Sequence, residues 1–368
     1  MPRPIRAVVD PAAISANIIK IKQLLKGVAV MPVVKANAYG HGLGRVFPGF
    51  QNADALAILE IEGAAMLRAS GWTKPIVLLE GCFDDADLNR AIELQCDWVV
   101  HNIDQLHDLE KLASKPLGYK PRIYLKLNTG MNRLGFQPTD GAAAIAWLDQ
   151  FATRNAWSSP VLMTHFANAD EAEPRDRRPL AEAQHQQLTQ LKPAHWQSSL
   201  ANSAGILNFP ELAGDIVRPG IAIYGASPGP HTAASYGLKP AMTLSSEIIA
   251  IQSVKKGERV GYGSRWQATE DGRIGVVACG YADGYPRLAP DGTPVWIEGR
   301  IASVAGRVSM DMMTIDLSNI PEAKVGSTVE LWGDNVPVDL VADHCGTIGY
   351  ELLCAIAPRV PFHTVVQP

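Results

Sequence analysis

The 368-residue chain has little cysteine, and its five cysteines are scattered: Cys82, Cys96, Cys279, Cys345 and Cys354. Their number is odd and no two are spaced as C-x-x-C, so neither a disulfide framework nor a zinc site is expected. Unpaired thiols persist in reducing compartments. We therefore expect a cytoplasmic protein with free cysteines and no bound metal.

Long apolar runs and clusters of one charge are also missing. No stretch approaches the roughly 18 apolar residues that a membrane helix needs, and the start, MPRPIRAVVD, lacks the apolar core of a signal peptide. The formal net charge is only −4, without a basic run, which argues against a nucleic-acid partner. Because 47% of the residues are hydrophobic and 19% charged, the composition is that of a globular protein.

The first 230 residues carry a repeated strand–helix pattern. An initial helix begins with Asp10 as its cap and Pro11 at its first position. Short apolar runs predict eight strands, at residues 28–35, 54–59, 75–79, 97–100, 122–127, 160–165, 196–200 and 215–218. Helical patterns lie between them, at 60–70, 85–95, 103–114, 140–154 and 180–191, with short turns near 42–50 and 203–208. Eight successive βα units predict an α/β fold with a closed, TIM-like (β/α)8 barrel.

The pattern changes near residue 230. The segment 226–240 has the composition of a linker. Strand-like runs with turn signals follow at 242–254, 273–279, 294–301, 303–316 and 327–332, and helical periodicity is weak there. We expect a barrel domain over 8–230 and a mostly antiparallel β domain over 231–368, with residues 1–7 as a candidate addition to the second domain.

Polar side chains follow several of the predicted barrel strands, at the end where barrel active sites lie. They comprise Lys35, Lys126, Arg133, His165, Asn202, Ser203 and Arg218. Lys35 ends an apolar strand, where burial lowers the pKa of an amine and makes it a candidate nucleophile. The alternative is a lysine whose ammonium group simply reaches solvent.

Short loops after the seventh and eighth predicted strands, ANSAG and PGI, occupy a place where barrels often bind phosphate. A reactive lysine beside a phosphate cup points toward pyridoxal 5′-phosphate (PLP). A Schiff-base aldolase would combine the same two features, so these residues alone leave both open.

The sequence also resembles a known family. VVKANAYGHG, residues 33–42, resembles the cofactor-attachment motif of bacterial alanine racemases, which are PLP enzymes of fold type III. The resemblance continues in order along the chain through YLKLNTGMNRLGF (124–136), MTHFA (163–167), ANSAG (201–205), VRPGIAIYG (217–225), ERVGYGSRW (258–266), GYADGYPR (280–287), GRVSMDMMTIDL (306–317) and GYELLC (349–354). Ser309 stands where some members carry cysteine.

The resemblance implies a role for each matching residue. Lys35 would hold PLP and act as one catalytic base, and Tyr262 would be the second. PLP would be bound by Lys35, Tyr39, His165, Ser203, Arg218, Gly220, Ile221 and Tyr350. Arg133 and Met310 would bind the substrate, and Lys126 matches a lysine that is often carbamylated.

The resemblance also implies an assembly and a reaction. Tyr262 and Met310 would reach the site from a partner subunit, so a homodimer with shared active sites is expected. Lys35 would take the α-proton of D-alanine and Tyr262 that of L-alanine, one from each face. In the cell, the reaction would either supply D-alanine for peptidoglycan or convert D-alanine to L-alanine for degradation.

Three alternatives remain at this point. A racemase of another small amino acid, such as serine, would share these motifs. A decarboxylase of basic amino acids would share the fold, but would generally pair the pyridine nitrogen with an acid where this chain has Arg218. A PLP-binding regulatory protein without turnover would lack the β domain.

Overall fold

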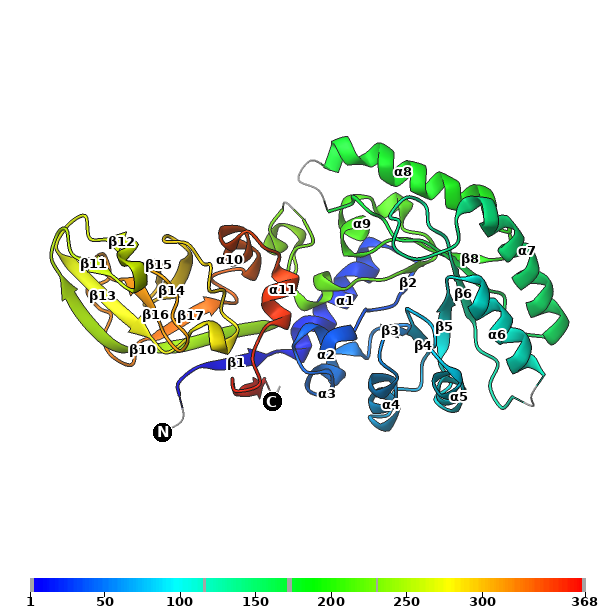
Figure 1. Cartoon of the computed structure of the whole chain (residues 1–368), viewed down its shortest axis with the longest axis horizontal. Coiled ribbons are helices and arrows are strands. Elements are labelled where there is room, and N and C mark those ends of the chain that lie inside the picture. Colours follow the sequence, from blue (N-terminus) through cyan, green and yellow to red (C-terminus); the bar gives the residue numbers. More distant parts are fainter. Residues whose placement is uncertain (1–2, 115–116, 171–173, 230, 366–368) are drawn as a thin grey trace.

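The structure is a computed structural model that describes residues 3–114, 117–170, 174–229 and 231–365. Two units lie side by side, a barrel surrounded by helices and a β domain (Figure 1). Among the described residues, no helix has the length and apolarity needed to span a membrane.

The barrel contains all eight predicted strands. They are β2 (Ala29–Val30), β3 (Leu56–Ile58), β4 (Ile76–Leu78), β5 (Asp97–Val100), β6 (Ile123–Lys126), β7 (Val161–Met163), β8 (Gln197–Ser199) and β9 (Ile216–Val217). Strands β3 to β8 form one parallel sheet, and β2 pairs in parallel with β9. A parallel bridge between Val33 and Ala57 joins β2 to β3, and Arg218 N donates to Ala201 O between β9 and β8. The ring is therefore closed, and the barrel prediction is confirmed.

Helices cover the outside of this ring. The α-helices are α1 (Pro11–Leu24), α2 (Lys35–Tyr39), α3 (Leu43–Val46), α4 (Ile61–Ala69), α5 (Asp85–Glu93), α6 (Ile103–Ala113), α7 (Pro138–Asn155), α8 (Pro174–Leu191) and α9 (Ser203–Asn208). Short 3-10 turns are η1 (Phe47–Phe50), η2 (Pro210–Leu212), η3 (Ile221–Tyr224) and η4 (Ala233–Tyr236). Asp10 caps α1 as predicted, because its carboxylate accepts from Ala12 N at 2.8 Å. Ile14 and Ile18 of this helix are fully buried against the barrel.

The β domain is built around one long strand, β10 (Met242–Val254). Its remaining elements are β11 (Arg259–Val260), η5 (Tyr262–Ser264), β12 (Trp266–Gln267), β13 (Gly272–Val277), η6 (Tyr281–Asp283), β14 (Pro294–Ile297), β15 (Arg300–Val304), β16 (Met313–Asp316) and β17 (Thr328–Trp332). Strand β10 pairs antiparallel with β17 along its first half and with β13 along its second half. The sheet thus closes on itself, and the prediction of a mostly antiparallel domain is confirmed.

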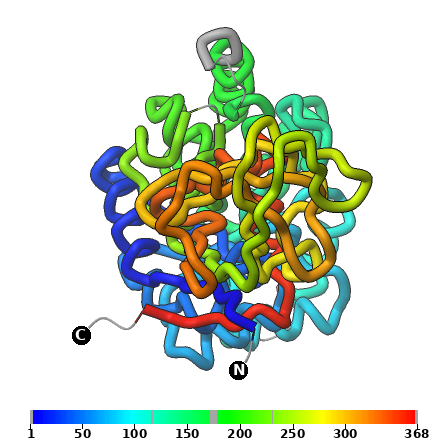
Figure 2. The backbone as a smooth tube through the Cα atoms, turned by 90° about the vertical axis from the view of Figure 1, so that its left-hand side faces the viewer, coloured from blue at the N-terminus to red at the C-terminus, as the bar shows by residue number. Residues whose placement is uncertain are grey.

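The two ends of the chain also join this sheet. Strand β1 (Arg6–Val9) pairs antiparallel with β10 and parallel with β18 (Phe362–Thr364). Figure 2, which looks onto the β domain, shows the N-terminal and C-terminal segments side by side. The N-terminal strand therefore extends two residues beyond the segment 1–7 considered from the sequence. Pro230, at the expected domain boundary, lies outside the described residues.

Two helices of the β domain were missed in the sequence. They are α10 (Val338–Cys345) and α11 (Gly349–Cys354), in a region where the helical periodicity of the sequence is weak. Helices this short depend on tertiary packing rather than on intrinsic propensity. Leu352 and Leu353 of α11 are buried against the barrel side of the molecule. This short helix carries Tyr350 to the barrel.

Candidate active site

A cavity of about 710 Å³ opens at the C-terminal ends of the barrel strands. It is lined by Val33, Lys35, Ala36, Tyr39, Leu59, Leu79, Glu80, Phe83, His101, Lys126, Arg133, Leu134, Met163, His165, Asn202, Ser203, Arg218, Gly220, Tyr350 and Cys354. Nine of the twelve predicted site residues are among them. Lys35, Lys126, Arg133 and Arg218 face a single acidic residue, Glu80, so the lining favours an anionic ligand.

Lys35 does not end a strand, as the sequence suggested, but begins the five-residue element α2. The next four residues have positive φ values of 51° at Ala36, 53° at Asn37, 56° at Ala38 and 50° at Tyr39. A left-handed turn of residues other than glycine costs about 1–2 kcal/mol per residue. The surrounding structure must hold this turn in place, as is typical of functional sites.

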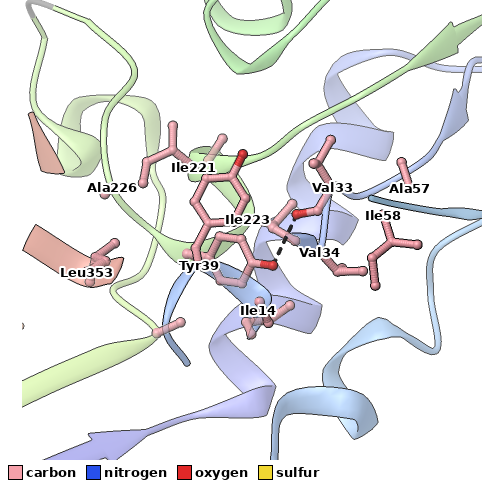
Figure 3. Packing of buried hydrophobic residues seen from close by; sticks show 14 of the residues in the cluster. Ile14, Val33, Val34, Tyr39, Ala57, Ile58, Ile221, Ile223, Ala226 and Leu353 are labelled. Carbon is pink, nitrogen blue, oxygen red and sulfur yellow. Dashed lines mark hydrogen bonds between the residues drawn. The ribbon is translucent and has the colours of Figure 1, made fainter. Parts of the chain in front are cut away.

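Several contacts support the left-handed turn from outside. Asn37 Oδ1 accepts from Leu43 N at 2.8 Å. Gly40 ends the turn with φ 80°, and a Cβ there would overlap the carbonyl of Leu353 in α11. Tyr39 packs among Val33, Val34, Ile221 and Ile223 (Figure 3). The turn therefore presents Lys35 and Tyr39 to the cavity from a close-packed base.

A cup lies on the β8–β9 side of the cavity. Ser203 Oγ accepts from Gly220 N at 2.9 Å and from Ala222 N at 3.2 Å. Ile221 N has no hydrogen-bond partner in the part of the chain that the structure describes. A Cβ at Gly220 would overlap Tyr39 Oη, so glycine is what allows this phenol to approach the loop. Backbone N–H groups and hydroxyls together form a donor set suited to a phosphate group.

Two tyrosines border this cup from different domains. The rings of Tyr39 and Tyr350 are 5.9 Å apart, and Tyr350 comes from α11. Burial raises the pKa of both phenols well above the usual range. The thiol of Cys354 raises the pKa of Tyr39 as well, and Tyr39 and nearby carboxylates raise that of Tyr350. Both phenols are therefore neutral hydrogen-bond donors near neutral pH, as an anionic ligand requires.

Arg218 is 3% exposed and is held from two strands. Its terminal nitrogens donate to Ser199 Oγ at 2.6 Å, Thr164 O at 2.7 Å and Leu200 O at 3.0 Å. One of them also donates to His165 Nδ1 at 3.2 Å. Burial lowers the pKa of Arg218 to about 10, so the group stays charged near neutral pH. Its Nε makes no hydrogen bond to any described residue and remains available to a ligand.

The state of His165 follows from this contact. A guanidinium only donates, so Nδ1 accepts from Arg218, and the other ring nitrogen, Nε2, lies 3.2 Å from the amide nitrogen of Asn202. Burial, and then the positive charge of Arg218, lower the pKa of His165 well below its usual range. His165 is therefore a neutral support for Arg218 and does not act as an acid.

Lys126 ends β6 and is 7% exposed. Burial, and then the charges of Arg218 and Arg133, lower the pKa of its ammonium group to about 8. Arg133 lies in the same cavity wall. Lys126 is thus partly unprotonated near neutral pH, unlike an exposed lysine.

Tyr262, Met310 and Ile221 do not line the cavity in the described part of this chain. Ile221 is fully buried behind the cup, and its backbone N–H is the relevant group. Tyr262 is 73% exposed and Met310 54% exposed, on the surface of the β domain. Figure 1 shows β11 and β12, which flank Tyr262, at the end of that domain farthest from the barrel. A single chain therefore does not bring Tyr262 to Lys35.

The turn that carries Met310 is nevertheless rigidly built. Tyr281 N donates to Ser309 O at 3.0 Å and Ala282 N to Met310 O at 3.0 Å. Below it, Asp283 is fully buried and accepts from Arg359 Nε at 2.7 Å and from Arg3 at 3.1 Å. Both arginines also contact Asp311, next to Met310. An exposed methionine is thus held in a fixed position.

Replacing Asp283 by asparagine should therefore destabilise the fold. We expect the free energy of unfolding to fall by about 1–3 kcal/mol, since the buried acceptor loses its charge and two arginines lose their partner. Urea unfolding measures this change. The control is Glu322→Gln, which breaks the exposed ion pair with Arg300 at 3.4 Å and should change stability by less than about 0.5 kcal/mol. Equal effects of the two substitutions would contradict the interpretation.

Sequence reasoning missed three polar residues of the cavity. Glu80 lies two residues after β4, His101 directly follows β5, and His101 Nε2 lies 3.1 Å from Glu80 O. The same rule that found Lys126 and His165 applies to these strand ends. Cys354 lines the cavity from α11, a helix that the sequence did not reveal. Among the described residues, no three His, Cys, Asp or Glu side chains are grouped to hold a metal ion.

Comparisons with known proteins cover the whole molecule. The alanine racemase N-terminal domain model matches residues 9–228 and the C-terminal domain model residues 241–364. Alanine racemases of Paraburkholderia phytofirmans and Burkholderia mallei are 48% and 47% identical over 365 and 364 residues, each covering 98% of this chain and 99% of the relative.

Solved structures of alanine racemases are also similar to this chain over its whole length. The biosynthetic alanine racemase of Pseudomonas aeruginosa matches with a TM-score of 0.90 and 44% identity, covering 99% of this chain and all of the other. The alanine racemase of Bartonella henselae, with covalently bound pyridoxal phosphate, matches with a TM-score of 0.85 and 25% identity, covering 99% and 100%.

The fold and the cavity together define a two-domain barrel enzyme whose site lies at the C-terminal ends of the strands. The chain belongs to the alanine racemase family, PLP-dependent isomerases that interconvert L- and D-alanine. The family resemblance seen in the sequence is thus confirmed, and the alternatives of an aldolase, a decarboxylase and a silent PLP carrier are not supported.

Proposed function

We propose that this chain binds PLP through Lys35 and interconverts L- and D-alanine as a homodimer with shared active sites. The observation that carries the proposal is the cavity itself, in which Lys35, a cup of hydrogen-bond donors and a buried arginine lie at the ends of different strands. The donor set fits the cofactor: Tyr39, Ser203, Tyr350 and the N–H groups of Gly220 and Ile221 would hold its phosphate.

The bound cofactor would supply an electron sink that makes the α-proton of an amino acid acidic enough to remove. Lys35 Nζ would remove and return this proton on one face of the substrate, and Tyr262 Oη on the other. Arg133 would pair with the substrate carboxylate, and the backbone of Met310 would border the alanine. Two bases on opposite faces are what inversion of one stereocentre requires.

Arg218 has a distinct part in this arrangement. Its Nε is left free, while its other nitrogens are fixed by Ser199, Thr164 and Leu200. As a permanent donor with no proton to give up, it would hydrogen-bond the ring nitrogen of the cofactor without protonating it. This would weaken the electron sink and favour return of the proton to the α-carbon.

The exposed position of Tyr262 and Met310 supports a shared site. Both are large, largely apolar side chains on the surface, and Leu288 (74%) and Met312 (44%) of the same domain are exposed as well. Exposed apolar groups of this kind mark interaction surfaces. We propose that this face of the β domain meets the barrel mouth of a second copy of the chain.

The test of the proposed function is direct. The purified protein should carry the visible absorption of lysine-bound PLP, and borohydride reduction followed by peptide mass mapping should place the cofactor on Lys35. Chiral chromatography should then show L-alanine converted to an equal mixture of both enantiomers. Protein that takes up no PLP, or leaves L-alanine unchanged, would refute the proposal.

Gly220 offers a sharper test of the phosphate cup. Gly220→Ala would place a methyl group against Tyr39 Oη, so we expect PLP to bind about 10–100-fold more weakly with little loss of stability. Titration of cofactor-free protein with PLP measures the dissociation constant. Gly118→Ala is the control, because a Cβ there meets no atom within 4 Å. Unchanged PLP affinity in Gly220→Ala would place the phosphate elsewhere.

We also propose that Lys126 is carbamylated and that the carbamate pairs with Arg133. Only an unprotonated amine reacts with carbon dioxide, and burial lowers the pKa of Lys126 to about 8. Carbamylation should therefore increase as the pH rises through about 8 and decrease below it. Carbon-13 NMR of protein in labelled bicarbonate measures the modification, with Lys126→Ala as the control. A signal that persists in the variant would assign it to another lysine.

We propose a biosynthetic role in the cell. Similarity to a protein described as biosynthetic favours the supply of D-alanine for peptidoglycan over its degradation. The five cysteines are all unpaired, which supports action in a reducing compartment, the cytoplasm. A strain that lacks the gene should need D-alanine for growth, and normal growth without it would favour a catabolic role.

A further inference from the structure

His41 is the most completely buried ionisable group near Lys35, and the proposed chemistry does not use it. Its side chain is 0% exposed and follows the left-handed turn by one residue. Burial lowers the pKa of the imidazole to about 4, and no charged side chain contributes to this shift. The ring is therefore neutral under ordinary conditions and carries a single N–H group.

The hydrogen bonds of His41 show where that proton lies. Nδ1 is 3.0 Å from Ala38 O and 2.9 Å from Tyr39 O. Both oxygens belong to backbone carbonyls, which only accept, so Nδ1 carries the proton. Among the described residues, the carbonyl of Tyr39 has no other hydrogen-bond donor. Without His41, this buried oxygen would be left without a partner.

The ring of His41 is itself fixed. It stacks on Tyr224, with ring centres 4.7 Å apart and planes at 28°. Tyr224 also stacks on Tyr39 at 4.8 Å, and its hydroxyl donates to Val33 O at 3.1 Å, the bond drawn in Figure 3. Through these contacts, Tyr224 connects His41 and Tyr39 to Val33, which precedes the left-handed turn.

The other ring nitrogen of His41, Nε2, makes no stabilising contact of this kind. Nε2 is buried and has no hydrogen-bond partner among the described residues. An unsatisfied buried acceptor is unfavourable, so a purely apolar ring would be the better choice if this position only had to fill space. The presence of histidine therefore points to the bonds made by Nδ1.

We propose that His41 is a positioning residue whose Nδ1–H group holds the left-handed turn and thereby sets Lys35 and Tyr39 for PLP binding. This inference rests on the proposed function, in which Lys35 carries PLP. It predicts that the hydrogen bond, and not the bulk of the ring, controls how tightly the cofactor is held.

Three variants separate these two contributions. His41→Phe keeps an aromatic ring for stacking on Tyr224 and removes both nitrogens. His41→Asn removes the ring but retains an N–H group that can reach the same carbonyls. Tyr285→Phe is the matched control, since Tyr285 is also fully buried with an unpartnered polar atom, but stacks on Trp332 within the β domain.

The readout is the PLP dissociation constant of cofactor-free protein and the loss of PLP from the loaded enzyme during dialysis. His41→Phe should weaken PLP binding at least about tenfold, whereas His41→Asn should stay within about threefold of the original protein. Tyr285→Phe should not change. Original affinity in His41→Phe, or loss in His41→Asn equal to that in His41→Phe, would overturn the proposal.

A second measurement needs no variant and holds even if His41→Phe does not fold. Nitrogen-15 NMR of the unaltered protein with labelled histidine reports which ring nitrogen carries the proton. We expect the Nδ1–H form for His41, and the Nε2–H form would overturn the inference. If the unaltered protein binds no PLP at all, the proposed function fails, whereas the tautomer still tests the contact itself.

Discussion

Replacing Lys35 by alanine should reduce alanine racemisation by at least about 10⁴-fold, because it removes both the attachment point of PLP and one catalytic base. The variant should also lack visible absorption from lysine-bound cofactor. The ammonium group of Lys35 makes no hydrogen bond to any described residue, so the melting temperature of the cofactor-free protein should stay the same. The initial rate of conversion of L-alanine measures the effect.

Lys255→Ala provides the matched control for this experiment. Its side chain is 75% exposed and pairs with Asp271 on the surface of the β domain. Full activity is expected in this variant. Retention of more than about 1% of the activity in Lys35→Ala would mean that another amine holds the cofactor, and Lys126 would be the first to examine.

Tyr262→Phe should reduce racemisation by about 10²–10⁴-fold, the usual contribution of a positioned general base. The phenol is 73% exposed in the single chain, so loss of its hydroxyl should not change the stability of the fold. The variant should still bind PLP through Lys35. A large loss of activity without loss of cofactor or stability would indicate a role in proton transfer.

Isotope exchange in deuterated water distinguishes the two bases in this variant. Lys35 alone should still exchange the α-proton of D-alanine, since it acts on that face without Tyr262. Exchange from L-alanine should fall together with racemisation. If both enantiomers lost exchange equally, Tyr262 would serve binding and not proton transfer.

The barrel could be predicted because its strands are defined by local patterns. The stretches 98–100 and 123–125 are continuous and apolar, and the barrel buries the strands that contain them on both sides. The short helices α10 and α11 could not be predicted from the sequence. A helix of six to eight residues is not stable by itself, so their stability comes from packing against the rest of the molecule. Tyr350 was assigned a role by family resemblance, without a structural reason for its position.

The site was predictable only in part for a related reason. Polar residues at strand ends identified Lys126, His165 and Arg218, which do lie together. The left-handed turn after Lys35 contradicts local preference, since Ala36, Ala38 and Tyr39 all favour negative φ. Such a turn exists only because the surrounding structure holds it, and no pattern in these residues alone predicts it. Likewise, nothing within one chain connects Tyr262 to the barrel.

The central claim is that Lys35 of one protomer works with Tyr262 of its partner, and mixed dimers test it most directly. Lys35→Ala and Tyr262→Phe chains should each be nearly inactive alone. After dissociation and random reassociation, half of the dimers would pair the two variants, and each such dimer would contain one intact site. The mixture should therefore recover about a quarter of the original activity. Activity no higher than the average of the two separate variants would show that each site is made within one chain.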